Sequence, residues 1–445
     1  MNGWKKVKLS DAAIVNPQVK LKKETLYPFV DMAAIEQGKK TVKFSELRAF
    51  SGGGSKFENG DTLFARITPC LENGKVAMFS GRTEFEVAHG STEFIIFRGR
   101  PDISNSNFIY YLVNSPEVRE FAISQMTGSS GRQRVPTSAF EHITVGLPPL
   151  AEQKAIAGVL SALDDKIELN RQMNETLEQT ARALFKSWFV DFEPVKNKIG
   201  RAKMEGRLLS SPLPLGEGQG EGCGLSEEIA ALFPSSFTNS PLGQIPEGWE
   251  VKSLDEVANF LNGLALQKYP AKNDDFLPVI KIAELRQGIT NNSNKASLDV
   301  AKEYIVNDGD VLFSWSGSLT QVLWTGGQGA LNQHLFKVTS ANPKWFHYYW
   351  VEHHLPWFQK IAASKATTMG HIQRMHLKQA KVLLPDVDFM KAADVILQPL
   401  LNRRLQCGVE NQILSQLRDT ILPKLISGEL RVGDAGKIIK EDLNG

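Results

Sequence analysis

The stretch Gly60–Phe64 (GDTLF) recurs 249 residues later as Gly309–Phe313 (GDVLF), and this repeat decides how the chain is organised. Three further matches keep the same order, with offsets of 245, 238 and 237 residues. They pair Gly3-Trp4 with Gly248-Trp249, Phe108–Leu112 (FIYYL) with Phe346–Trp350 (FHYYW), and Val145–Pro148 (VGLP) with Val382–Pro385 (VLLP). Because the matches are collinear, we expect two copies of one framework whose surfaces have diverged.

The composition is that of a globular protein with more than one structural unit. The chain has 445 residues, of which 42% are hydrophobic and 22% charged, and its formal net charge is +2. A wholly basic nucleic-acid binder is therefore excluded, and any nucleic-acid surface must be a local patch. The three cysteines lie far apart, which argues against disulfides and a cysteine metal site. We find no leader-like apolar segment and no run of 18 apolar residues, so we expect a cytoplasmic protein without a membrane span.

Each copy is predicted to end in a long helix. Residues 151–188 contain no proline and a single glycine. The residues that would face a partner helix follow a 4-3-4-3 spacing, which is typical of a coiled-coil seam: Ile156, Leu160, Leu163, Ile167, Asn170, Asn174, Leu177, Ala181, Leu184 and Trp188. Asn170 and Asn174 either set the register of this pairing or mark where the helix leaves its partner.

The second helix is expected over residues 388–426, with a stripe spaced by four: Leu397, Leu401, Leu405, Val409, Ile413, Leu417 and Ile421. The predicted order is a mixed module at 1–149, a helix at 150–192, a linker at 193–245, a second module at 246–386, a helix at 387–432 and a tail at 433–445. The linker holds 8 Gly and 5 Pro in 53 positions. Buried strands such as Phe94–Phe97 alternate with aromatic helices such as Lys344–Ala363, which predicts an α+β protein.

A search for catalytic motifs fails. The three Gly-Lys pairs lack the rest of a phosphate-binding loop, and Asn16-Pro17-Gln18 lacks the second proline expected of an amino-methyltransferase. Glu152-Gln153-Lys154 fits a nuclease triplet but has no acidic partner nearby, so we interpret it as a surface pair. His353-His354 and the His371/His376 pair lack further ligands at regular spacing. We therefore expect no catalysis, bound cofactor or metal in this chain.

DNA contacts are predicted mainly in loops. Residues 1–149 carry 19 Lys/Arg against 15 Asp/Glu. The loop Gly128–Arg134 (GSSGRQR) combines small residues with arginine and glutamine, which can bond guanine and adenine edges. Its counterpart in the second copy is Met369–Arg374 (MGHIQR). The predicted DNA-binding residues are Lys56, Arg66, Arg132, Gln133, Arg134, Asn332, Gln333, His371, Gln373 and Arg374; ordinary solvated loops are the alternative.

Four segments closely resemble the DNA-specificity subunit of type I restriction–modification enzymes: Ala183–Pro194 (ALFKSWFVDFEP), Leu417–Leu430 (LRDTILPKLISGEL), Leu147–Gln153 (LPPLAEQ) and Ile245–Trp249 (IPEGW). The resemblance covers nearly the whole chain, although the low-complexity insert at 212–222 departs from the usual linker. It implies two target-recognition domains joined by an antiparallel coiled coil of two conserved helices. It also implies two methylation subunits that bind S-adenosylmethionine, and restriction subunits that use ATP and Mg²⁺. This chain would recognise double-stranded DNA without catalysis.

Helix geometry makes the expected mechanism concrete. A helix of about 38 residues spans ~57 Å, enough to hold two DNA readers about one helical turn, ~34 Å, apart. Because the modules differ in sequence, we expect two different half-sites flanking an unread spacer. The alternative is a catalytic DNA methyltransferase or nuclease with duplicated DNA-binding domains, and a second alternative is a coiled-coil scaffold without DNA specificity.

Overall fold

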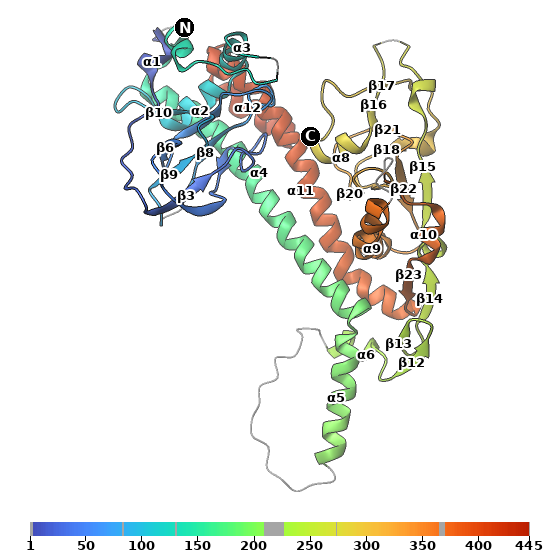
Figure 1. Cartoon of the computed structure of the whole chain (residues 1–445). Coiled ribbons are helices and arrows are strands. Elements are labelled where there is room, and N and C mark those ends of the chain that lie inside the picture. The colour runs from blue at the N-terminus through green and yellow to red at the C-terminus, as the bar shows by residue number, and fades with distance from the viewer. Residues whose placement is uncertain are drawn as a thin grey trace. The chain divides into compact units, whose positions relative to one another are not determined.

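The computed structural model describes residues 3–81, 84–129, 131–208, 227–272, 274–364 and 370–444 (Figure 1). It divides into two units. Unit 1 comprises Met1–Leu169 with Glu410–Gly445, and unit 2 comprises Asn170–Val409. Each unit therefore contains one mixed module and parts of both long helices. The low-complexity insert at 212–222 lies outside the described residues.

The module of unit 1 contains two sheets and a separate strand pair. The separate pair is β1 (Lys5–Lys8) with β11 (Thr144–Leu147). The first sheet has the order β2 (Ala13–Val15), β10 (Phe94–Gly99), β7 (Thr62–Ala65), β8 (Val76–Phe79) and β4 (Thr41–Val42). The second has the order β5 (Glu46–Ala49), β3 (Leu26–Val30), β9 (Val87–Gly90) and β6 (Ser55–Glu58). The helices are α1 (Leu9–Ala12), α2 (Ser106–Asn114), α3 (Pro116–Ser124) and the 3₁₀ turn η1 (Thr137–Glu141).

The module of unit 2 repeats this plan. Its separate pair is β14 (Glu250–Ser253) with β23 (Lys381–Leu384). One sheet has the order β15 (Asn259–Asn262), β22 (Leu335–Thr339), β19 (Val311–Ser314) and β20 (Gln321–Leu323). The other has the order β17 (Lys295–Ala296), β16 (Leu277–Ile280), β21 (Gly329–Leu331) and β18 (Ile305–Val306). The helices are α7 (Leu254–Val257), α8 (Ile282–Gln287), α9 (Lys344–Ser364) and α10 (Arg374–Gln379), with 3₁₀ turns η3 (Leu266–Lys268) and η4 (Lys302–Tyr304).

The pairing directions confirm the duplication predicted from the sequence. The only parallel pairs in the two equivalent four-stranded sheets are β3 with β9 and β16 with β21, and each is flanked by antiparallel neighbours. The strand pair that closes each module also keeps its register, because Lys5 lies opposite Leu147 and Glu250 lies opposite Leu384. The fold is α+β, as predicted.

Aromatic side chains fill the modules. In unit 1, Phe64, Phe97 and Phe140 pack edge to face with ring centroids 5.0–5.7 Å apart. Strand β10 is buried on both faces over Phe94–Phe97, which explains why its sequence is continuously apolar rather than alternating. Helix α2 starts where the Asn105 side chain accepts a hydrogen bond from the Phe108 amide.

The long helices run close to their predicted bounds. Helix α4 (Leu150–Phe185) continues into η2 (Lys186–Val190), one turn of π-helix, and α11 spans Val387–Ser427. In unit 1 the two helices are antiparallel, since Asp164 pairs with Arg418 and Lys166 with Glu410. In unit 2 the two helices are also antiparallel, because Met173 contacts Cys407 and Glu178 contacts Arg404.

Most predicted seam residues of α4 are covered. Leu160, Leu163, Ile167, Asn170 and Trp188 are buried, whereas Asn174, Leu177 and Leu184 are half-buried. On α11, Leu401, Leu417 and Ile421 are buried and Leu405 is half-buried. The predicted stripe is wrong at Ile413, which is 39% exposed. A step of four residues advances a helix by about 400°, so a stripe of such steps turns away from its partner; Cys407 and Leu414 take the buried positions instead.

Several shorter elements complete the chain. They are α5 (Glu193–Leu208), α6 (Glu227–Leu232), the hairpin β12 (Phe237–Ser240) with β13 (Gly243–Pro246), and α12 (Val432–Asn444). Partly buried Leu430, Val432, Ile438 and Ile439 at the end of the chain pack on the core of unit 1. Within the residues that the structure describes, no helix is both long and apolar enough to span a bilayer.

Candidate nucleic-acid interface

Three backbone segments meet at one place in unit 1, and they contain three of its five predicted DNA-binding residues. We define junction 1 as Arg66–Thr68, Ser91–Glu93 and Gln133–Val135. The Arg66 amide donates to the Glu93 carbonyl (3.0 Å), and the Arg66 carbonyl accepts from the Val135 amide (2.9 Å). The Thr68 amide donates to the Gln133 carbonyl (3.0 Å). These hydrogen bonds fix the backbone of the three segments, and thereby the positions from which their side chains extend.

The predicted loop forms a short hairpin on this junction. Thr127 and Arg134 exchange two backbone hydrogen bonds, of 3.0 and 2.9 Å. Gly128 and Gly131 have φ angles of 124° and 78°, which glycine adopts without strain and which allow the tight turn. Ser130 lies outside the described residues. The hairpin carries Arg132 near its exposed tip.

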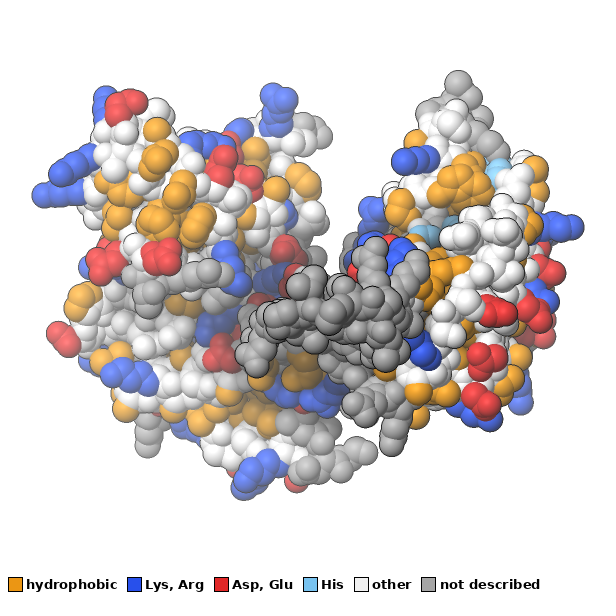
Figure 2. Space-filling model, turned by 90° about the horizontal axis from the view of Figure 1, so that it is seen from below, with side chains coloured by type: hydrophobic (Ala, Val, Ile, Leu, Met, Phe, Trp, Pro, Cys, Tyr) orange, Lys and Arg blue, Asp and Glu red, His pale blue; other side chains and the backbone are white. Residues whose placement is uncertain are grey.

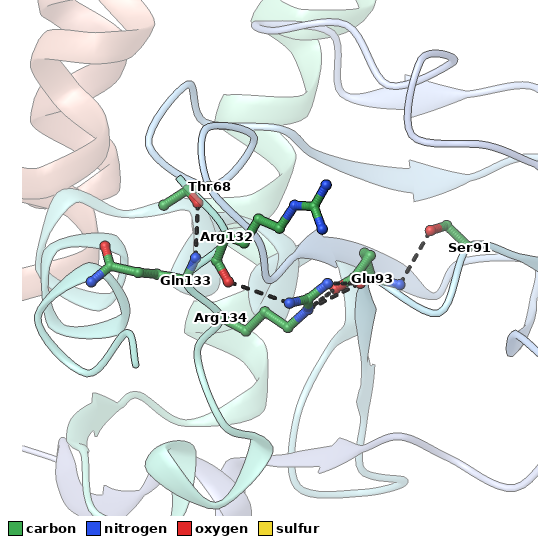
Figure 3. A network of polar contacts seen from close by, with 6 residues as sticks. All are labelled: Thr68, Ser91, Glu93, Arg132, Gln133 and Arg134. Carbon is green, nitrogen blue, oxygen red and sulfur yellow. Dashed lines mark hydrogen bonds and ion pairs between the residues drawn. The ribbon is translucent and has the colours of Figure 1, made fainter. Parts of the chain in front are cut away.

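The three polar side chains of this hairpin have different environments (Figure 3). The Arg134 guanidinium binds Glu93, with 2.9 Å from Nε to Oε2 and 2.7 Å from Nη2 to Oε1. This bonding raises the pKa of Arg134 above its usual value, so it remains charged. The Gln133 amide donates to Thr68 Oγ1 (3.1 Å), while its side chain extends away from the Arg134–Glu93 pair. The Arg132 side chain is exposed, which leaves it accessible to a ligand.

Lys56 and Arg66, the other two candidates of unit 1, line one groove of about 890 Å³. Its wall includes Gln18 and the exposed Lys20, which the sequence analysis missed although it precedes two further lysines at 22 and 23. Arg66 Nε is buried without a hydrogen-bond partner among the described residues. Lys56 Nζ lies 5.1 Å from the ring centroid of Phe50. Three cationic side chains around one groove suit contact with phosphate groups.

Unit 2 contains the same junction with different side chains. Junction 2 comprises Trp315–Gly317, Asn332–His334 and Gly370–Ile372. The Trp315 amide donates to the His334 carbonyl (3.3 Å), the Ile372 amide donates to the Trp315 carbonyl (2.9 Å), and the Gly317 amide donates to the Gly370 carbonyl (2.8 Å). Each bond has its counterpart in junction 1. Trp315, His334 and His371 therefore stand where unit 1 has Arg66, Glu93 and Arg134.

The side chains of junction 2 form an aromatic and imidazole cluster. The Trp315 ring centroid lies 5.9 Å from that of His334 and 6.3 Å from that of His371. Ser316 Oγ and His334 Nδ1 share a hydrogen bond of 3.0 Å. Trp315 Nε1 donates to Asn262 Oδ1 (2.8 Å). Where junction 1 offers full charges, junction 2 offers rings with single donors and acceptors.

This equivalence pairs the residues of the two predicted loops, which the sequence had matched only as segments. Met369–Arg374 is the right segment, but the residue equivalent to Arg134 is His371 rather than Arg374, and Met369 lies outside the described residues. Gln373 is exposed and precedes α10 as its N-terminal cap. Arg374 is exposed, and its Nη2 donates to the Phe260 carbonyl (3.1 Å).

The predicted pair Asn332 and Gln333 is less accessible than expected. Asn332 is 5% exposed, and its Oδ1 accepts from the His334 amide (3.3 Å), so it supports the backbone of junction 2. Gln333 is half-buried, and its Nε2 donates to His334 Nε2 at 3.4 Å. The sequence analysis missed Glu93, Trp315 and His334. The 249-residue offset of the GDTLF repeat would have identified Trp315 as the equivalent of Arg66 in the second copy.

Charge is distributed rather than concentrated. On the face shown in Figure 2, Lys and Arg side chains are scattered among Asp and Glu side chains instead of forming one continuous patch. This distribution agrees with the nearly neutral composition. On this face, contact with a polyanion would therefore depend on particular side chains more than on a broad field.

The residues first considered as catalytic have structural contacts. Glu152 accepts from Trp4 Nε1 (3.1 Å) and pairs with Arg431, and Gln153 is buried with hydrogen bonds to Pro148 and Asn105. His354 Nε2 lies 2.8 Å from the Lys381 carbonyl, and burial lowers the pKa of His354 to about 4. His376 Nδ1 accepts from the Gln373 amide (2.9 Å). Within the described residues, no three His, Cys, Asp or Glu side chains cluster as metal ligands.

Comparison with known proteins assigns the family. The model of the type I restriction modification DNA specificity domain matches residues 1–179 and again residues 246–413. The chain belongs to this family. The two matches to the specificity domain cover both modules and a part of each long helix, as the duplicated fold requires.

Curated relatives of this DNA specificity domain family resemble the chain over most of its length. The type I restriction enzyme HindI specificity subunit of Haemophilus influenzae is 25% identical over 426 residues, covering 87% of this chain and 90% of the relative. The MjaIX specificity subunit of Methanocaldococcus jannaschii is 26% identical, covering 74% and 69%.

Two solved structures are also similar. The HsdS subunit from Thermoanaerobacter tengcongensis has 17% identity and a TM-score of 0.33, and the match covers 96% of this chain and 98% of that one. The type I restriction–modification S subunit from M. genitalium has 15% identity and a TM-score of 0.49, and the match covers 95% and 96%.

Proposed function

We propose that this chain is the DNA-recognition subunit of a type I restriction–modification complex, and that each unit reads one half of a bipartite, asymmetric target. One observation carries the proposal: junctions 1 and 2 repeat the same backbone hydrogen bonds but present different side chains. A conserved frame with exchanged side chains is what two readers of different bases require.

The chemistry of the junctions supports different half-sites. In unit 1, Arg132 suits bidentate contact with guanine, and Glu93 or Arg134 suits exocyclic donors or acceptors on base edges. Lys20, Lys56 and Arg66 suit the phosphates beside such a contact. In unit 2, Trp315 offers an apolar surface, while His334 and His371 offer single hydrogen bonds. The target of unit 2 therefore depends less on charge than that of unit 1.

Catalysis belongs to partner subunits in this proposal. The curated relatives are named as specificity subunits of type I restriction enzymes, which supports an assembly of this chain with methylation and restriction subunits. We propose two copies of the methylation subunit, one for each half of the target. S-adenosylmethionine, ATP and Mg²⁺ would be bound by those partners. This chain would supply the double-stranded DNA contacts and the docking surface.

Target mapping tests the assignment of one half-site to each unit. The variant R132A/R134A, assembled with its methylation subunits, should relax base identity in one half-site and leave the other half-site and the spacer unchanged. Modified adenines mapped across DNA give the readout. Lys154→Ala removes an exposed charge from α4 and serves as the control. Loss of both half-sites together, or of neither, contradicts independent readers.

The catalytic alternative has its own test. The purified chain, incubated with DNA and labelled S-adenosylmethionine but without partner subunits, should transfer no methyl group. Methyl transfer by the chain alone would replace the proposed role with that of a methyltransferase carrying duplicated DNA-binding domains. Activity that appears only when the methylation subunits are added supports the proposal.

A further inference from the structure

Two buried ion pairs between the long helices have the same polarity. In unit 1, Asp164 of α4 binds Arg418 of α11, with 2.8 Å between Oδ1 and Nη1. In unit 2, Glu178 of α4 binds Arg404 of α11. Each of these four side chains is at most 15% exposed. In both pairs the acid belongs to α4 and the arginine to α11.

Tyrosines of the adjoining module fix each ion pair. In unit 1, Tyr111 donates its hydroxyl hydrogen to Asp164 Oδ2 at 2.6 Å. In unit 2, the Arg404 guanidinium donates to the hydroxyls of Tyr348 and Tyr349 at 3.4 and 3.5 Å. These tyrosines belong to the repeated FIYYL and FHYYW stretches. Each ion pair is therefore held by the same element of its own module, and its charges have little freedom to find other partners.

The two ion pairs follow one helix register. From Asp164 to Glu178 the chain advances fourteen residues along α4, and from Arg418 to Arg404 it goes back fourteen residues along α11. Fourteen residues are two heptads, so both acids lie on the same face of α4 and both arginines on the same face of α11. That face is the one that contacts the other helix in each unit.

The duplication indicates which residues would face each other if two α4 helices, or two α11 helices, from different copies of the chain paired. An offset of 237 residues relates α4 to α11, as at Leu160 and Leu397 or Trp188 and Leu425, which are all buried. By this offset, Ala181 is the α4 counterpart of Arg418, and Ser415 is the α11 counterpart of Glu178. In a pair of two α4 helices, Asp164 would thus face Ala181. In a pair of two α11 helices, Arg404 would face Ser415.

We propose that these two ion pairs make unlike repeats associate, α4 with α11, and reject association of like repeats from different copies of the chain. In a like pair the four charges lose their partners on the other helix, although Glu178 keeps Arg182 and Arg418 keeps Asp419 on their own helices. This loss weakens association by on the order of 100-fold or more. The pair Lys166–Glu410 has the opposite polarity, but its side chains are 37% and 33% exposed and contribute less. Buried polar groups select partners in this way in coiled coils.

Partner choice can be measured on the full chain after a single cut. A protease site placed between Leu208 and Glu227 yields two fragments, one with α4 and one with α11. The cut chain is unfolded in urea and refolded at pH 8.5, where Glu178 is ionised, and native mass spectrometry counts the pairs. We expect the wild-type fragments to form unlike pairs, with like pairs below about 5%.

Substitution of the ion pairs provides the decisive comparison. E178L/R404L replaces one ion pair by apolar side chains, so that like pairs no longer bury these two charges without a partner on the other helix. The share of like pairs should rise well above that of the wild type. D164L/R418L is an independent variant with the same expected result. Replacing all four residues by leucine removes both ion pairs, and like pairs should then approach half of the protein, the statistical share when all pairings are similar.

Two results would overturn the proposal. If like pairs make up about half of the wild-type protein, as expected from random pairing, the ion pairs do not determine which repeats associate. If both double variants form only unlike pairs, the apolar seam selects instead of the charges. The double variants decide the question even where the fourfold variant does not fold, because each retains the other ion pair in the intact chain.

Discussion

Arg134 and His371 are equivalent residues: Arg134 forms an isolated antiparallel bridge with Ile67, and His371 forms the same bridge with Ser316. One is a cation paired with Glu93, and the other lies against the ring of Trp315. The two copies of the module thus keep the same backbone position, but the side chain at that position is an arginine in one copy and a histidine in the other. This relationship makes the contribution of single side chains at the junctions measurable.

Glu93→Gln should strengthen DNA binding without altering stability. The change releases Arg134 from an ion pair whose side chains are 42% and 24% exposed, so the free energy of unfolding should change little, because solvent screens such a pair. The freed guanidinium can contact a phosphate, which increases the salt dependence of log Kd by about one unit. Titrations of the assembled complex at several salt concentrations measure the slope. Glu141→Gln, at an exposed position, is the control. An unchanged slope would show that the freed Arg134 contacts no phosphate.

Trp188→Ala should destabilise unit 2. Trp188 is 1% exposed, and its ring packs edge to face on Phe233 and on Phe389 of α11. Loss of a buried tryptophan costs about 3–5 kcal/mol through lost transfer energy and the cavity left behind. Hydrogen exchange should accelerate in unit 2, and thermal unfolding should begin earlier. Trp357→Ala, at a residue 38% exposed, should have a much smaller effect. Equal effects of the two variants would contradict this packing argument.

The sequence predicted the elements with long-range regularity and missed those without it. Collinear repeats predicted the duplication, and heptad spacing predicted α4 to within a few residues, because both patterns sum over many positions. The junctions assemble from three separate segments, and loop insertions change the repeat offset from 249 residues at Arg66 to 237 at Arg134. No single window contains Glu93 and Arg134 together. The ion pair between Glu93 and Arg134 could therefore be identified only in the folded structure, where the strands bring the two segments together.

His347 should make the folded chain less stable in acid. Burial lowers the pKa of His347 to about 4, and the positive charge of Lys344 adds to this effect. An unfolded histidine has a pKa near 6.5, so between pH ~6.5 and ~4 the unfolded chain binds a proton that the folded chain does not. The stability contribution is complete above that window and falls by up to about 3 kcal/mol as the pH decreases through it.

A comparison of variants isolates this contribution. Burial raises the pKa of Glu178 to about 7, against the opposing charge of Arg404, so Glu178 stabilises the folded chain as pH falls and partly offsets His347. The measurement is therefore the difference in unfolding free energy between wild type and His347→Leu. This difference should shift in favour of the variant between pH 6.5 and 4. His142→Leu, at an exposed histidine, is the control, and a flat result for His347→Leu would show that the burial of His347 is not coupled to folding.

Lengthening both long helices should lengthen the spacer of the target. Seven residues inserted after Leu169 in α4 and seven after Val409 in α11 add two helical turns and keep the seam on the same face. Each insertion adds about 10 Å, which corresponds to about three base pairs of DNA. Mapping of modified adenines for the assembled variant should recover the original half-site bases with a longer spacer.

A matched insertion separates helix length from chain length. Seven residues added between Leu208 and Glu227 lengthen the chain without lengthening α4 or α11, so the spacer should stay the same. Because base identity depends on the junctions and spacing on the helices, the two properties should change independently. Altered half-site bases with the original spacer, after the helix insertion, would show that the helices support the junctions but do not set the distance between them.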